Sequence, residues 1–114
     1  MTLQEQEKHF NALVEELKGI LIKKGDDYSG KDRLSNFKTA GVIAGITPEQ
    51  NCLSLIATKV ARLGNLLSTG KEPNNEPVED SIKDLINYSI LLHMLHYEHK
   101  PYYTNKYPEQ SLPF

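Results

Sequence analysis

The sequence of 114 residues has a single cysteine, no tryptophan and no long apolar run. One cysteine excludes an internal disulfide and any zinc site built from several thiolates. No stretch approaches the roughly 20 apolar residues of a membrane-spanning helix. The first 11 residues are polar and acidic, unlike a signal peptide. We therefore expect a cytoplasmic protein without a membrane span.

An excess of one charge is also lacking, because 13 Lys and Arg residues stand against 15 Asp and Glu residues, a formal net charge of −2. Proteins that bind the nucleic acid backbone normally carry a strong positive excess, so we do not expect nucleic acid as the partner. A small anionic ligand needs only a local basic cluster and stays compatible with this balance. The hydrophobic content of 39% is sufficient for one core.

What the sequence does have is helical periodicity, in four segments. Thr2 with Glu5, and Thr47 with Gln50, have the spacing of capping boxes, so they predict the start of the first and third helices. Apolar residues recur at a 3.6-residue period through all four segments. The predicted helices span residues 3–24, 34–44, 48–68 and 77–98.

Glycines and prolines predict where these helices end. Gly25 ends the first helix and Gly45 the second, and Pro101 ends the fourth. Residues 25–33 then form a polar loop. We predict an all-α fold with a four-helix core of three long helices and one short helix, over residues 1–100 as a single domain. Residues 101–114, with three tyrosines and three prolines, form an irregular aromatic tail.

The predicted core consists of one apolar stripe per helix, and the second half of the fourth helix is apolar almost all round, as in a central buried helix. The predicted core residues are Phe10, Leu13, Val14, Leu17 and Leu21; Leu34, Phe37 and Ile43; Cys52, Leu55, Ile56, Val60, Leu63, Leu66 and Leu67; and, on the fourth helix, Val78, Ile82 and Leu85 in its first half and Ile90, Leu91, Leu92, Met94 and Leu95 in its second.

Lys59 interrupts the apolar stripe of the third helix. At about 100° per residue it falls between Leu66 and Cys52, and Arg62 lies one turn further on, at the edge of the stripe. Burying an ammonium without a partner costs several kcal/mol. We therefore expect a carboxylate from another helix opposite Lys59.

The fourth helix offers such carboxylates. Glu76, Asp80, Asp84 and Asn87 are spaced by 4, 4 and 3 residues, so they share one stripe of that helix. Three interpretations are open: a divalent cation bound by the carboxylates, direct ion pairs with Lys59 and Arg62, or a solvated acidic face.

Small residues, namely Ala57, Ala61 and Gly64, form a second stripe on the back of the third helix. They are either exposed to solvent or the place where a second subunit approaches closely.

The ordered segments KKGDDYSG, NF, ATKVARLGNLL and EPVEDSIKDLINYSILL resemble the nucleotide modification associated domain, type 1. This small family is common among phages and bacteria and occurs with genes for nucleotide metabolism and base modification. The chain is more distantly similar to the all-α nucleoside triphosphate pyrophosphatases of the MazG and dimeric dUTPase group. The resemblance covers about residues 23–95, and its most specific part is Asp80-x-x-x-Asp84-Leu-Ile-Asn87-Tyr88 together with Lys59-x-x-Arg62.

The resemblance implies a MazG-like, nucleotide-handling protein that assembles as a homo-oligomer, a dimer or tetramer. MazG-like enzymes hold Mg²⁺ with E-x-x-E on one helix and E-x-x-D on a later one, and water attacks the α-phosphate. The later motif best matches Asp80 and Asp84. Where E-x-x-E is expected, this chain has Lys59 and Arg62, which cannot ligate Mg²⁺.

The resulting predicted site has three parts. Asp80, Asp84 and Glu76 are the predicted Mg²⁺ ligands. Lys59 and Arg62 neutralise phosphate charge and Asp84 orients the attacking water, which makes these three the predicted catalytic residues. The predicted substrate-binding residues are Lys59, Arg62, Asn87, Tyr88, Asp27 and Tyr28.

Three functions remain open from the sequence: a Mg²⁺-dependent nucleoside triphosphate pyrophosphohydrolase, a non-catalytic nucleotide-binding or regulatory module, and a helical interaction protein in which the ion pairs are structural.

Overall fold

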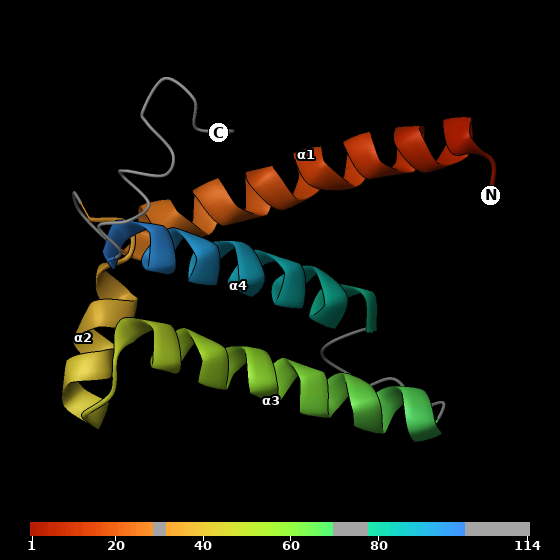
Figure 1. Ribbon diagram of the computed structural model, residues 1–114. Coiled ribbons are helices and arrows are strands. Elements are labelled where there is room, and N and C mark those ends of the chain that lie inside the picture. The colour runs from red at the N-terminus through yellow and green to blue at the C-terminus, as the bar shows by residue number, and fades with distance from the viewer. Residues whose placement is uncertain (29–31, 70–77, 100–114) are drawn as a thin grey trace. The chain divides into compact units, whose positions relative to one another are not determined.

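The computed structural model describes residues 1–28, 32–69 and 78–99, with side chains at 1–23, 32–68 and 78–98. It contains four helices (Figure 1): α1 (Leu3–Tyr28), α2 (Ser35–Ala44), α3 (Pro48–Thr69) and α4 (Val78–His99). The described residues form no strand, which confirms the predicted all-α class. The predicted tail, 101–114, lies outside the described residues. The chain divides into two units, Met1–Asn36 and Phe37–Phe114, and each is described by itself. Within the described ranges, no helix is long and apolar enough to cross a membrane.

The two predicted capping boxes are confirmed. The Thr2 backbone N–H donates to Glu5 Oε2 over 2.9 Å, and the Glu5 N–H donates back to Thr2 Oγ1 over 3.1 Å. Thr47 and Gln50 make the same reciprocal pair over 2.9 and 3.0 Å. Because each box satisfies two N–H groups that the first turn leaves without helical partners, it fixes the residue at which the helix begins.

The predicted end of α1 is wrong. Gly25 was expected to terminate the helix after Lys24, but α1 continues to Tyr28. Glycine in a helix interior costs only about 1 kcal/mol relative to alanine, so a single glycine does not have to stop a helix of this length. A hydrogen bond connects the segment after α1 to this helix: the Arg33 guanidinium donates to the Ile22 carbonyl over 2.7 Å.

Gly45 does end α2, as predicted. Its φ is positive, at 72°. The Ile46 N–H donates to the Gly41 carbonyl over 2.9 Å, and the Gly45 N–H donates to the Val42 carbonyl over 3.2 Å. These two bonds form a Schellman motif, which turns the chain directly into the capping box of α3.

The pair α3 and α4 forms the packed part of the second unit. The two helices lie side by side and run antiparallel (Figure 1). Cys52 on α3 and Ser81 on α4 are both 0% exposed, and Leu95 on α4 is also 0% exposed. Small side chains at two of these buried points allow the helix axes to approach closely.

Part of the predicted core is exposed. Cys52, Leu63 and Leu66 are buried as predicted, but Leu55, Val60 and Leu67 are not. The physical reason is that one neighbouring helix covers only part of a wide apolar arc. Predicted core residues are also exposed on the other helices, at Phe10, Val14, Ile43, Ile82, Ile90 and Met94.

The turn after α2 predicts opposite effects for two glycine substitutions. A Cβ on Gly41 would lie 2.8 Å from the Ile46 carbonyl oxygen and 3.3 Å from the Pro48 nitrogen, both backbone atoms, whereas a Cβ on Gly19 meets nothing within 4 Å. We expect Gly41→Ala to lower the free energy of unfolding by about 1–3 kcal/mol. Gly19→Ala should raise it by about 0.5–1 kcal/mol. Urea denaturation measures both; equal effects would contradict the close contact.

The burial of Cys52 predicts an alkaline loss of stability. Burial raises the pKa of this thiol from 9.0 to about 11. The folded protein therefore keeps a proton that the unfolded chain loses above pH 9, so the contribution is complete below pH 9 and is lost as the pH rises towards 11. Between pH 8 and 11, wild type should lose on the order of 2 kcal/mol more than Cys52→Ala, as thermal melts at each pH will show. Parallel losses in the two proteins would contradict this assignment.

Candidate functional site

Lys59 and Asp84 meet across α3 and α4. Lys59 Nζ lies 3.1 Å from Asp84 Oδ2, and the two side chains are only 16% and 28% exposed. This confirms the prediction that a carboxylate of the fourth helix faces the lysine on the apolar stripe. At this exposure the ammonium has lost much of its hydration, so the carboxylate compensates a real desolvation cost.

The register of the two helices follows from a second contact. Cys52 Sγ donates to the Tyr88 carbonyl over 3.4 Å. Going along α3 from Cys52 to Lys59 corresponds to going backward along α4 from Tyr88 to Asp84, as antiparallel packing requires. The cysteine and the lysine are seven residues apart, about two turns, so both lie on the face of α3 that contacts α4.

The other described site residues differ in their environment. Arg62 and Asp80 are exposed, Tyr88 is half-buried, and Asn87 is buried with 7% of its surface exposed. The structure therefore places a basic side chain, Arg62, at the surface one turn beyond the covered Lys59. Asp80 lies one turn before Asp84 on α4.

Three predicted site residues are not tested by the geometry. Glu76 lies outside the described residues, and so do the side chains of Asp27 and Tyr28. Among the side chains that the structure does describe, no group of three His, Cys, Asp or Glu residues is arranged to hold a metal ion.

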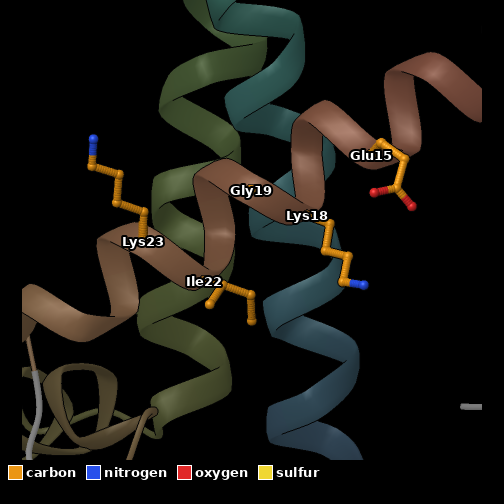
Figure 2. Close-up of a pocket in the computed structure, with 5 residues that line it drawn as sticks. All are labelled: Glu15, Lys18, Gly19, Ile22 and Lys23. Atoms are coloured by element: carbon orange, nitrogen blue, oxygen red, sulfur yellow. The ribbon is translucent and has the colours of Figure 1, made fainter.

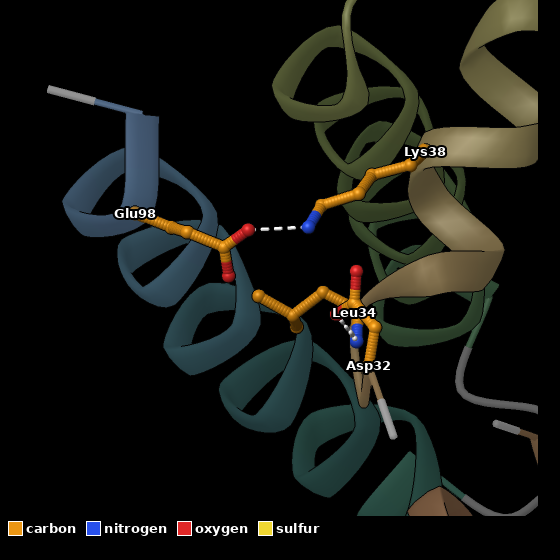
Figure 3. A network of polar contacts seen from close by, with 4 residues as sticks. All are labelled: Asp32, Leu34, Lys38 and Glu98. Carbon is orange, nitrogen blue, oxygen red and sulfur yellow. Dashed lines mark hydrogen bonds and ion pairs between the residues drawn. The ribbon is translucent and has the colours of Figure 1, made fainter. Parts of the chain in front are cut away.

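Two other ion pairs allow the exposure of the Lys59–Asp84 pair to be compared. Lys38 on α2 pairs with Glu98 at the end of α4 (Figure 3), and Lys83 Nζ lies 3.2 Å from Glu79 Oε1 one turn earlier on α4. In each of these pairs the carboxylate is more exposed than Asp84, at 43% for Glu98 and 78% for Glu79, although the Lys83 side chain is itself only 14% exposed. The Lys38–Glu98 pair is partly exposed at both ends and contributes about 0–1 kcal/mol. What distinguishes the Lys59–Asp84 pair is that both partners, and not the lysine alone, are largely covered.

Figure 3 also shows the turn that precedes α2. Asp32 Oδ1 accepts a hydrogen bond from the Leu34 N–H over 3.0 Å. This is the turn-forming use of an aspartate, so Asp32 has a local structural role.

A hollow on α1 contains none of the predicted site residues. It is lined by Glu15, Lys18, Gly19, Ile22 and Lys23, all from one helix. In Figure 2 the Lys18 and Lys23 side chains point in opposite directions, so their charges do not converge on one anion. We therefore do not assign a ligand to this hollow.

Sequence reasoning did not foresee the role of Ser81. Its burial at 0% is unusual for a hydroxyl side chain, and it lies on the face of α4 that contacts α3. A small residue three positions before Asp84 is the only signal for it in the sequence, and the acidic neighbours at 79 and 80 obscure that signal.

Comparisons with family models, with curated proteins and with solved structures find no match for this chain.

The Lys59–Asp84 geometry predicts unequal effects for two carboxylate substitutions. Asp84→Asn leaves a mostly covered ammonium without this carboxylate, so it should lower the free energy of unfolding by about 1–3 kcal/mol. The matched control on the same helix, Glu98→Gln, removes the carboxylate partner of Lys38 in a pair that is more exposed at both ends, and it should cost less than about 0.5 kcal/mol. Urea denaturation of both variants measures the difference. If both cost the same, Lys59 and Asp84 are not coupled more strongly than a surface pair.

Proposed function

We propose that the protein binds a nucleotide through its phosphates, with Lys59 and Arg62 as the phosphate-binding residues. The observation that carries the proposal is that Lys59 lies in a largely covered position and is held there by Asp84. A lysine that a carboxylate already orients loses less side-chain freedom when it binds an anion. Because Asp84 also balances the charge of Lys59, Arg62 has to contribute to phosphate binding as well.

The two cations have complementary properties. Lysine supplies a compact charge with three donors, and arginine supplies a planar fork that matches two oxygens. Because Lys59 and Arg62 are three residues apart on one helix, they are neighbours on its surface. In this proposal Asp84 is a positioning residue, since it acts through Lys59, and Tyr88, half-buried nearby on α4, is a candidate contact for the base or sugar.

The predicted Mg²⁺ site does not fit the described residues. Asp84 faces an ammonium at 3.1 Å, and a divalent cation at the same carboxylate would be repelled by that charge. The described side chains also lack a group of three potential ligands. The magnesium site therefore stays a prediction that depends on Glu76, and we base no step of the mechanism on it.

Hydrolysis of a nucleoside triphosphate to a monophosphate and pyrophosphate is the reaction that the resemblance implies. The cations at Lys59 and Arg62 would neutralise charge that develops on the phosphates during such a step. The competing function is an interaction protein in which the Lys59–Asp84 pair only orients α3 against α4. One observation supports this alternative: both side chains of the Lys59–Asp84 pair are largely covered, as expected of a structural ion pair between two helices. We also propose that the protein functions as a homo-oligomer.

The nucleotide proposal predicts a ligand-dependent thermal shift. A nucleoside triphosphate at 100 times its Kd should add about 2.7 kcal/mol and raise the Tm on the order of 10 °C. Arg62→Gln should abolish this shift while leaving the unliganded Tm within a few degrees, because Arg62 is exposed. Lys18→Gln, which removes an exposed cation on α1 outside the proposed site, is the control and should keep the shift.

The measurement is a thermal-shift panel of nucleoside mono-, di- and triphosphates, with and without Mg²⁺, and a parallel assay of released pyrophosphate. Pyrophosphate release that Arg62→Gln abolishes would establish hydrolysis. If no nucleotide shifts the Tm of wild type, the structural alternative is correct.

A further inference from the structure

The end of α2 and the turn that follows it expose an apolar surface. Val42 and Ile43 are 82% and 81% exposed, and Ile46 in the turn is 37% exposed. The sequence has no charged residue from Thr39 to Pro48. Exposed apolar side chains that lie together are typical of a surface that binds another segment or molecule. We call Val42, Ile43 and Ile46 the α2 patch.

The end of α4 lies beside the helix that carries this patch. Glu98 forms an ion pair with Lys38 of α2 (Figure 3), and both residues belong to the second unit. Lys38 and Val42 are four residues apart on α2, so they share one face of that helix and are about 6 Å apart along its axis. The chain therefore leaves α4 next to the face of α2 that carries Val42.

The sequence after α4 has a composition that matches the α2 patch. Residues 101–114, PYYTNKYPEQSLPF, contain three tyrosines, a phenylalanine and a leucine, and their one lysine and one glutamate give a formal charge of zero. Aromatic side chains bury a large apolar area, and the tyrosine hydroxyl can stay in water. A segment of this kind can cover an uncharged apolar surface without desolvating a charge.

The first aromatic residues of this segment are within reach of the patch. Tyr102 and Tyr103 follow Glu98 by four and five residues, and a chain spans at most about 3.3–3.6 Å per residue, so they reach up to about 13–18 Å from Glu98. This exceeds the axial distance from Lys38 to Val42. A segment joined to its binding surface by so short a connection has an effective concentration in the millimolar range, which favours it over a separate partner.

We propose that the segment 101–114 docks on the α2 patch of the same chain, with Tyr102 and Tyr103 against Val42 and Ile43. The docked segment covers the apolar surface at the α2–α3 turn and joins the end of α4 to α2 beyond the Lys38–Glu98 pair. The proposal does not rest on nucleotide binding, because the α2 patch contains none of the proposed phosphate-binding residues.

A double-mutant cycle in the full chain tests the contact. Val42→Ser, and Tyr102→Ser combined with Tyr103→Ser, should each lower the Tm by about 4–8 °C. All three substitutions together should lower the Tm no further than the larger of these two losses. Valine and serine have similar helix propensities, so the loss at position 42 reports the contact. Val60→Ser is the matched control, because Val60 is a half-exposed valine on α3, and its effect should add to that of the tyrosine substitutions.

A disulfide test shows whether the segment docks on its own chain. At about pH 8, Val42→Cys combined with Tyr103→Cys should form an intramolecular disulfide, read by mass spectrometry of non-reduced peptides. Val60→Cys combined with Tyr103→Cys should not. Cys52 does not compete, because it is buried and its thiol pKa is raised to about 11.

Two outcomes would overturn the proposal. Additive losses of Tm in the cycle mean that the tyrosines do not contact the α2 patch, which another segment or a separate partner then covers. Coupled losses with disulfides only between two chains mean that the segment docks on a second copy. Neither outcome affects the nucleotide proposal, which the thermal-shift panel tests separately.

Discussion

The structure of the second unit depends on one constraint, which is that a lysine on an apolar helix face needs a carboxylate opposite it. Lys59 and Asp84 satisfy this constraint at 3.1 Å. Shifting one helix by one residue would rotate a side chain by about 100° and separate the two charges. The pair therefore specifies the register of α3 against α4. Cys52 and Ser81, both fully buried, then allow the backbones to come close enough for that contact.

The ion pair and the apolar contacts contribute differently to the packing of α3 against α4. The ion pair specifies the register of the two helices, whereas the apolar contacts hold them together. The apolar residues between the helices supply the hydrophobic free energy, but many registers bury a similar area. A partly buried ion pair contributes little net stability and strongly penalises the registers that break it. This division explains why a charged residue is compatible with a predicted core position. It also means that the same ammonium is already oriented if a phosphate reaches it.

The helix caps and turns were predicted from the sequence more accurately than the burial of the side chains. Capping boxes at Thr2 and Thr47 and the turn at Gly45 depend on a few adjacent residues, so they could be read directly. The Lys59–Asp84 contact was predictable because a charged residue on an apolar stripe needs an oppositely charged residue on the helix that packs against it. The burial of Val60 and Leu67 was mispredicted because periodicity defines an apolar arc without saying which neighbour covers it. The prediction that Gly25 ends the first helix was wrong for another reason: a glycine inside a helix costs only about 1 kcal/mol relative to alanine.

The cations at 59 and 62 determine what chemistry this pair of helices can support. Where MazG-like enzymes are expected to use carboxylates and a metal to offset phosphate charge, this chain presents Lys59, which Asp84 orients, and the exposed Arg62 one turn further on. Such cations stabilise a phosphate directly and are present without a metal. Lys59 also makes Asp84 a poor ligand for a divalent ion, because the two opposite charges lie 3.1 Å apart and balance one another. If a phosphate binds here, as we propose, the charge pattern favours its recognition by side chains over recognition through a resident metal.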